Sequence, residues 1–386
     1  MNDCIGKLIK GLAFLYELLP IFSVEKMNFQ QERRPKMKIR KTGKTNKPMH
    51  YVESQFYEYY VAIDWSSTVM TIARMRSNSI EPKVNRDLPA KLKIIKEYIK
   101  QLSGKIILTI EETTGAQWLY VELKDYVDKI IICDPYRNSL LKEGPKNDHK
   151  DAAELCRLLR AGLLKEVYHS NDENYKIRKL VSSYNDLIKA AVRAKNQLSS
   201  IYRGYGLNYK KDELKTEDQY IKHIVEEKLR AIDLYEDEKK KYLEIFKQLE
   251  KKNKTIKNLM GISGIDKILA VKIFSIVIDA SRFEDKYKYW SYCGLVKYKM
   301  ESGGRFYGKK NTKYSRELKA SYKTATQAAL RGNNDIREYY ERMLKEGISD
   351  RQARSTLCRY IAKSTYAMMR NGTEYKSYNW RKKQSN

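Results

Sequence analysis

A regular apolar repeat over residues 177–201 is the strongest constraint that this sequence places on its fold. Apolar residues follow one another at alternating steps of three and four, at Ile177, Leu180, Tyr184, Leu187, Ala191, Ala194, Leu198 and Ile201. This spacing places them on one side of a long helix and is typical of a coiled-coil seam. A weaker apolar run follows the break YRGYGLNYKKDE. We therefore expect two long helices, which form either an antiparallel hairpin or an oligomerisation arm, with a plain helical spacer as the alternative.

The residues before this arm alternate between strand and helix patterns. Strand patterns occur in YEYYVAIDW, TVMTIARMR, KIILTIEE and DKIIICDP, and a short turn separates the first two. Helical periodicity occurs in LPAKLKIIKEYIKQL and QWLYVELKDYV. Strands that alternate with helices indicate an α/β domain with a mixed sheet. We place this domain at 56–168 and the helical arm at 169–256.

Residues 257–373 have mainly helical patterns and form a third domain. Within it, LMGISGIDKILAVKIFSIV places a glycine turn between apolar helices. This is the pattern of a helix-hairpin-helix, whose backbone N–H groups can bind a phosphate. Asp266 stands at this turn, and its charge would repel a phosphate. At the ends of the chain we expect a basic flexible extension (1–55) and a basic tail (374–386).

The charge of the chain indicates a polyanionic partner. The 386 residues carry a formal net charge of +29 and include 31 tyrosines, whose rings can stack on bases. We therefore predict DNA or RNA as the partner, against the simpler alternative of a solvated basic surface. The five cysteines form no CxxC pair, which argues against a zinc site and favours a cytoplasmic setting. The longest apolar stretch, residues 11–22, is too short to span a bilayer, so we expect no membrane partner.

Four carboxylates of the α/β domain form a candidate metal site. Asp64 lies at the end of the first strand, on the face opposite its apolar neighbours, and Glu112 ends the third strand segment. Asp148 and Asp151 project from one face of a helix, one turn apart. Such a set suits Mg²⁺ or Mn²⁺, which prefer oxygen ligands and can be shared with a substrate phosphate. A turn or capping role explains any one of these residues equally well, and Asp148 could be a helix N-cap.

These motifs, in this order, resemble those of the insertion-sequence-110 family of transposases, the DEDD recombinases that a bridge RNA guides. The matching segments are VAIDWSS around Asp64, EETTGAQWL with Glu112 as its acid, and KNDHKDAAELCRLL with Asp148 and Asp151. Further along, GISGIDKILAVKI and YWSYCGLVKYKMESGGR resemble the helix-hairpin-helix and GL…SGG segments of the family. We choose Glu112 over its neighbour Glu111 because a Thr-Gly pair follows it at the family spacing.

The resemblance implies an RNase H-like (RuvC-like) N-terminal domain, an α-helical coiled-coil arm and a mainly α C-terminal transposase domain. It also implies that Ser302, in the C-terminal domain, attacks a DNA phosphodiester and forms a covalent link, with Mg²⁺ or Mn²⁺ at the carboxylates. Implied partners are DNA, a guide RNA and further copies of the chain, as a dimer or tetramer with a composite site between subunits. The setting would be the nucleoid of a prokaryotic cell.

Two alternatives stay open. One is a metal-dependent junction-resolving nuclease in which water attacks the phosphodiester and Ser302 has no role. The other is an inactive, domesticated nucleic-acid-binding protein.

Overall fold

The computed structural model describes residues 57–139, 148–170 and 172–377. The side chains at 139, 148–150 and 172 are not part of this description. The expected extension at 1–55 lies outside the described residues, as does most of the expected tail. Within the described part, no helix has the length and apolar character that crossing a bilayer requires.

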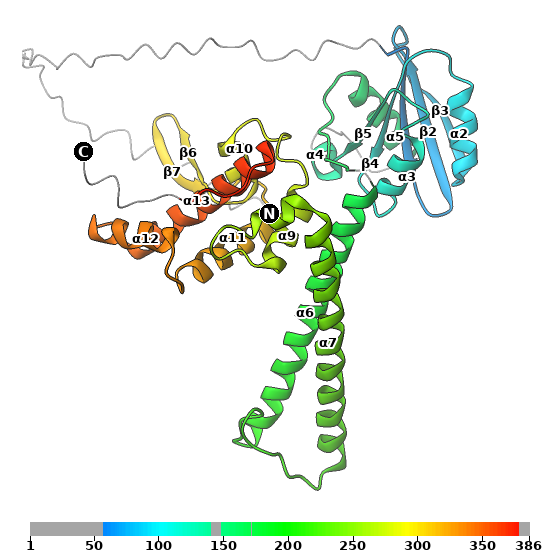
Figure 1. The fold of residues 1–386 in the computed structure, drawn as a ribbon. Helices are drawn as coiled ribbons and strands as arrows, with labels where there is room; N and C mark the ends of the chain where they lie inside the picture. Colours follow the sequence, from blue (N-terminus) through cyan, green and yellow to red (C-terminus); the bar gives the residue numbers. More distant parts are fainter. Residues whose placement is uncertain (1–56, 140–147, 171, 378–386) are drawn as a thin grey trace, which may run out of the picture. The chain divides into compact units, whose positions relative to one another are not determined.

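A five-stranded mixed sheet forms the centre of the N-terminal part (Figure 1). Its strands are β1 (Tyr59–Trp65), β2 (Val69–Arg76), β3 (Lys83–Pro89), β4 (Ile106–Glu111) and β5 (Lys129–Cys133). Their spatial order is β3-β2-β1-β4-β5. The first three strands pair antiparallel, whereas β4 runs parallel to β1 and β5 runs parallel to β4. The expected mixed sheet is thus confirmed, and its order is consistent with an RNase H-like domain.

Helices cover both faces of this sheet. On one face, α2 (Leu92–Lys100) and α3 (Ala116–Leu123) pack against the odd-numbered residues of β1, such as Val61 and Ile63. On the other face, α5 (Asp148–Arg160) packs against Ala62. Strand alternation therefore assigns each position of β1 to one of two helical layers. A short helix, α4 (Pro135–Ser139), follows β5.

The arm consists of α6 (Asp172–Gly204) and α7 (Gln219–Lys252), which lie antiparallel (Figure 1). The ring of Tyr184 lies 5.1 Å from that of Phe246, and Lys195 forms an ion pair of 2.6 Å with Glu236. Most seam residues are buried and the others half-buried. Of the arrangements expected from the sequence, the antiparallel hairpin therefore agrees with the contacts within the chain. Assembly with a second copy stays a prediction.

The C-terminal part is mainly helical and contains one small β-hairpin. Its elements are α8 (Lys254–Leu259), α9 (Lys267–Val277), α10 (Lys286–Tyr292), β6 (Tyr298–Ser302), β7 (Arg305–Lys310), α11 (Arg316–Ala329), α12 (Asp335–Lys345) and α13 (Asp350–Asn371). One hydrophobic core joins the long helices of this part and also includes Ile177 and Phe246 of the arm. The end of the arm that adjoins this part is therefore packed into the C-terminal core.

Candidate active site

Asp64 lies near the C-terminal end of β1, on the sheet face that α5 covers. Two side chains of the same strand, Tyr60 and Ala62, belong to that face and lie in one cluster with α5. The Sγ of Cys156 in α5 donates a hydrogen bond of 3.2 Å to the carbonyl oxygen of Tyr60. Since strand residues alternate between faces, Asp64 shares the face of Ala62. This agrees with the position expected for the first carboxylate.

The two adjacent glutamates after Ile110 have different positions. Glu111 is the last residue of β4 and shares the α5 face with Ile107, which packs against Leu159. Because Ile63 pairs with Ile110 in the parallel ladder, the next residue of each strand follows the same register. Glu111 therefore lies beside Asp64 at the C-terminal ends of β1 and β4. Glu112 lies one residue beyond the strand and is exposed. The assignment of Glu112 as a metal ligand stays a prediction, and Glu111 is the glutamate that the register brings nearest to Asp64.

Glu112 is held instead by His169, a residue that no sequence motif singled out. The Oε2 of Glu112 lies 2.5 Å from the Nε2 of His169. The Nδ1 of His169 lies 2.7 Å from the Oε1 of Gln117. The Nε2 of Gln117 donates to the carbonyl oxygen of Ser170 at 3.0 Å, so its Oε1 is the acceptor and the Nδ1 of His169 the donor. The His169 side chain is 6% exposed. A chain of hydrogen bonds from Ser170 through Gln117 and His169 therefore reaches the exposed carboxylate of Glu112.

The acidic first turn of α5 lies toward the same C-terminal ends of β1 and β4. Leu159, in the last turn of this helix, lies in one cluster with Tyr57, which precedes β1, whereas Ala152 near its start lies in the cluster that contains Ala62. The helix therefore runs antiparallel to β1. Its first turn, with Asp148 and Asp151, is carried toward the C-terminal ends of β1 and β4. The topology thus brings to one region the parts of the chain that bear the predicted carboxylates.

The chemistry of these donors fits a hard divalent cation, since each supplies carboxylate oxygens. Among the described side chains, no three His, Cys, Asp or Glu residues are close enough together to hold a metal ion. The side chain of Asp148 is not among them. The fit of these residues to a divalent cation therefore rests on their carboxylate oxygens and on their common location at the C-terminal ends of β1 and β4.

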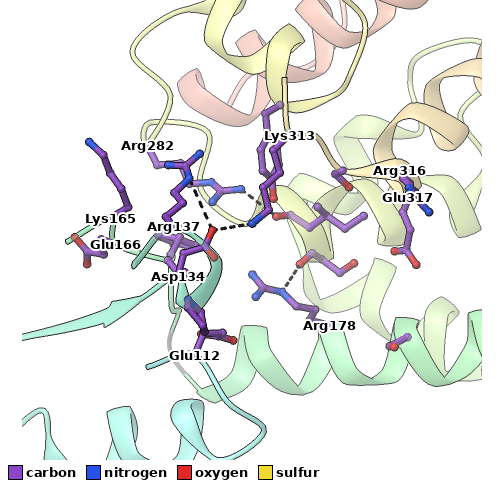
Figure 2. Close-up of a pocket in the computed structure, with 18 of the residues that line it drawn as sticks. Glu112, Asp134, Arg137, Lys165, Glu166, Arg178, Arg282, Lys313, Arg316 and Glu317 are labelled. Atoms are coloured by element: carbon purple, nitrogen blue, oxygen red, sulfur yellow. Dashed lines mark hydrogen bonds and ion pairs between the residues drawn. The ribbon is translucent and has the colours of Figure 1, made fainter. Parts of the chain in front are cut away.

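A cleft of about 690 Å³ opens beside Glu112 (Figure 2). Its charged lining consists of Glu112, Asp134, Arg137, Lys165, Glu166, Arg178, Arg282, Lys313, Arg316 and Glu317. The Nζ of Lys313 donates a hydrogen bond of 2.7 Å to the Oδ2 of Asp134, as Figure 2 shows. This hydrogen bond lowers the pKa of the Asp134 carboxyl below its usual value. Cations outnumber carboxylates in this lining, so the cleft is suited to phosphate groups.

Arg282 contacts three aromatic rings at the wall of this cleft. Its guanidinium lies 4.6 Å from the ring centroid of Tyr168, 4.5 Å from that of Phe283 and 4.9 Å from that of Tyr292. It also donates to the carbonyl oxygen of Ile276 at 3.3 Å. Cation–π contacts of this kind stabilise one orientation of the guanidinium. Arg282 therefore presents a fixed positive charge at the cleft wall.

Ser302 lies at the tip of the β6–β7 hairpin, in a different part of the chain from the carboxylates. It pairs with Arg305 across a two-residue turn, Gly303 and Gly304, whose φ angles are 54° and 75°. Such a turn needs positive φ at both positions, which glycine adopts without strain. The Ser302 side chain is exposed. The predicted nucleophile is therefore accessible to a large substrate.

The expected helix-hairpin-helix turn connects α8 to α9. The Oδ1 of Asp266 accepts a hydrogen bond of 2.8 Å from the Leu269 N–H and thereby caps α9. Gly264 has a φ of 90°, and a Cβ at this position would lie 2.2 Å from the carbonyl oxygen of Ala325 in α11. The turn is thus used for close helix packing. The carboxylate of Asp266 occupies the N-terminal end of α9, where a phosphate would bind. This position agrees with the expectation that the charge of Asp266 would repel a phosphate here.

The mixed sheet with helices on both faces is consistent with an RNase H-like domain, and the cationic lining of the cleft is suited to a phosphate-bearing substrate. Two protein-family models match the chain. The DEDD transposase model of the IS110 type, described as "Transposase", matches residues 61–206, and the "Transposase IS116/IS110/IS902 family" model matches residues 256–341. Together they span more than half of the chain. No curated protein matches it.

The chain belongs to the IS110 family of transposases, which are enzymes that cut and rejoin DNA. DNA is therefore a substrate of this protein. Transposases of the DEDD type generally use divalent metal ions. The family assignment expected from the sequence is confirmed.

Proposed function

We propose that this transposase acts with a guide RNA and that Ser302 is its nucleophile. The observation that best supports the serine assignment is the exposed position of Ser302 directly before a turn of two glycines, whereas the guide RNA is proposed from the family resemblance. Space is open around both glycines, since a Cβ on either would meet no atom within 4 Å. Arg305, which pairs with Ser302, and Lys310 lie in the next strand on the same face as Ser302. A phosphate can therefore approach the hydroxyl closely while cations balance its charge.

The chemical step is a phosphoryl transfer to the serine hydroxyl. The Oγ of Ser302 attacks the phosphorus of a DNA phosphodiester, and a new P–Oγ bond forms. The bond from phosphorus to one bridging deoxyribose oxygen breaks. The departing oxygen takes up a proton, and the proton of the serine hydroxyl is lost to the surroundings. Attack by a second DNA hydroxyl reverses this step, rejoins the strand and frees Ser302.

The carboxylates contribute the cation site of this reaction. Asp64, Glu112, Asp148 and Asp151 would hold Mg²⁺ or Mn²⁺, and Glu111 is the alternative to Glu112. A divalent cation bound there would stabilise the charge that develops on the leaving oxygen. In this proposal, the fold brings these carboxylates together at the C-terminal ends of two neighbouring strands, β1 and β4, and in the first turn of α5.

Self-association through the arm completes the proposal. Although the seam residues of α6 are used within the chain, the arm exposes further apolar side chains. These are Val192, Ile224, Leu229, Leu234 and Ile245, which are 39% to 59% exposed. These exposed side chains are available for packing against a second copy. A composite site, with carboxylates from one subunit and Ser302 from another, would follow from such assembly.

Substitution of Asp64 by asparagine tests the metal assignment, because it preserves volume and removes charge. We expect DNA cleavage to be lost and RNA binding to remain. Mg²⁺ should raise the melting temperature of the wild type by mass action, and this increase should vanish in Asp64→Asn. Asp125→Asn, at an exposed acid of the same domain, is the control and should behave as wild type.

Comparison of Glu111→Gln with Glu112→Gln identifies which glutamate joins the three aspartates as a ligand. Only the variant of that glutamate should lose the increase in melting temperature that Mg²⁺ causes. Full cleavage by Asp64→Asn would contradict the metal assignment. Cleavage that needs Mg²⁺ but leaves no protein linked to DNA would favour the junction-resolving nuclease.

A further inference from the structure

The β6–β7 hairpin exposes aromatic side chains that the catalytic proposal does not use. Tyr298 is 47% exposed, Phe306 55% and Tyr307 61%. Both strands are exposed along almost their whole length, and only Met300 and Gly308 are half-buried. A two-stranded hairpin in water gains little from its own packing. Large rings on both of its faces therefore indicate a surface that is covered when the protein acts.

The pairing register assigns these side chains to faces. Residues directly opposite each other in an antiparallel pair share a face, and successive pairs alternate. Ser302 pairs with Arg305, and Glu301 pairs with Phe306. The face of Phe306 is thus opposite to that of Ser302. The next pair, Met300 with Gly308, shows that Tyr307 is the extra residue of a β-bulge.

The charges around these rings favour a nucleic-acid strand as the occupant. Lys299 pairs with Lys309 on the face of Phe306, and Arg305 lies beside Ser302 on the other face. The one carboxylate of the hairpin, Glu301, is partly neutralised by Lys299 at 3.7 Å. Aromatic rings interleaved with cations are suited to bind a nucleic-acid strand, because its phosphates can contact the lysines while its bases stack on the rings. A second copy of this basic chain would have to bury those cations against like charge.

We propose that Phe306 stacks on an unpaired base of the DNA, next to the phosphate that Ser302 attacks. The two residues belong to adjacent pairs of the ladder at the tip of the hairpin, and their side chains extend from its opposite faces. The hairpin then enters the DNA as a wedge, with Ser302 and Arg305 toward the phosphate and Phe306 toward the base. The position of the attacked phosphate rests on the proposed function, whereas the base contact does not.

Binding of a single-stranded oligonucleotide that contains 2-aminopurine tests this contact. The measurement uses the full chain with Ser302→Ala as background, so that no DNA is cut. Stacking on Phe306 should quench the 2-aminopurine fluorescence, and Phe306→Ala should lose the quenching and about five- to a hundredfold in affinity. Phe306→Trp, which keeps a stacking face, should restore both. Tyr220→Ala, at an aromatic side chain that is 82% exposed on α7, is the matched control and should change neither.

Three results would overturn the proposal. Equal affinity and quenching for Phe306→Ala and its background would show that no base stacks there. A loss of affinity in Lys309→Gln without any loss in Phe306→Ala would reduce the hairpin to an electrostatic contact. A change of oligomeric mass in Phe306→Ala, with DNA binding unchanged, would assign the ring to a second copy.

Failure of the catalytic proposal would look different from these results. Cleavage would then persist in Ser302→Ala, while the effect of Phe306→Ala on binding would remain.

Discussion

Gly264→Ala should lower the free energy of unfolding by about 2–5 kcal/mol, and two features of the structure set this magnitude. Gly264 has a φ of 90°, and a left-handed conformation costs an L-residue about 1–2 kcal/mol. The added Cβ would also lie 2.2 Å from the carbonyl oxygen of Ala325 and 2.7 Å from the nitrogen of Ala329. These are backbone atoms of α11, so no side-chain rotation relieves the overlap. Overpacking of this kind costs about 1–3 kcal/mol more.

Urea unfolding followed by circular dichroism measures the effect, with Gly347→Ala as the matched control. Gly347 has a φ of 82° and no atom within 4 Å of the position of its Cβ. It should therefore show only the conformational cost of about 1–2 kcal/mol. Equal destabilisation by the two substitutions would refute the close approach to α11. Normal stability with a loss of DNA affinity in Gly264→Ala would instead assign the turn to phosphate binding.

Three further substitutions test the site, the arm and the cleft. His169→Gln should lower cleavage or Mg²⁺ affinity about tenfold or more, because the carboxylate of Glu112 loses its orienting partner, whereas His223→Gln on the arm should have no effect. Leu234→Glu should reduce the oligomeric mass seen by light scattering without unfolding the arm, since Leu234 is 59% exposed; an unchanged mass would place the contact elsewhere. Lys313→Gln should flatten the acid dependence of stability. The lowered pKa of Asp134 means that its contribution is present above a pH of about 3.9 and is lost as the pH falls further. Identical acid unfolding of Lys313→Gln and wild type would contradict the contact.

The strongly periodic parts of the fold could be predicted from the sequence. The buried strands β1, β4 and β5 and the long helix α6 have continuous apolar patterns, because each is packed on at least one side. The strand β3 has no such pattern. It lies at the sheet edge with mostly exposed residues, and its pairing with β2 defines it. Edge strands depend on a partner that local sequence does not specify.

The candidate site was predictable only in part, for a similar reason. Strand alternation placed Asp64, but the choice between Glu111 and Glu112 depends on where β4 ends and how it pairs with β1. His169 follows no motif, and its role emerges only because the fold brings it to Glu112. The assignment of Ser302 rests on the family resemblance, since a Ser-Gly-Gly turn by itself indicates no chemistry.

The covalent intermediate tests the central claim most directly. Labelled target DNA is incubated with the protein, its guide RNA and Mg²⁺, and is then separated on a denaturing gel. The protein-linked band is digested, and the peptide that bears the DNA remnant is mapped by mass spectrometry. Wild type should give a linked band with the remnant on Ser302, and Ser302→Ala should give no such band. A linked band in Ser302→Ala, or clean cleavage by wild type without a linked species, would contradict serine attack.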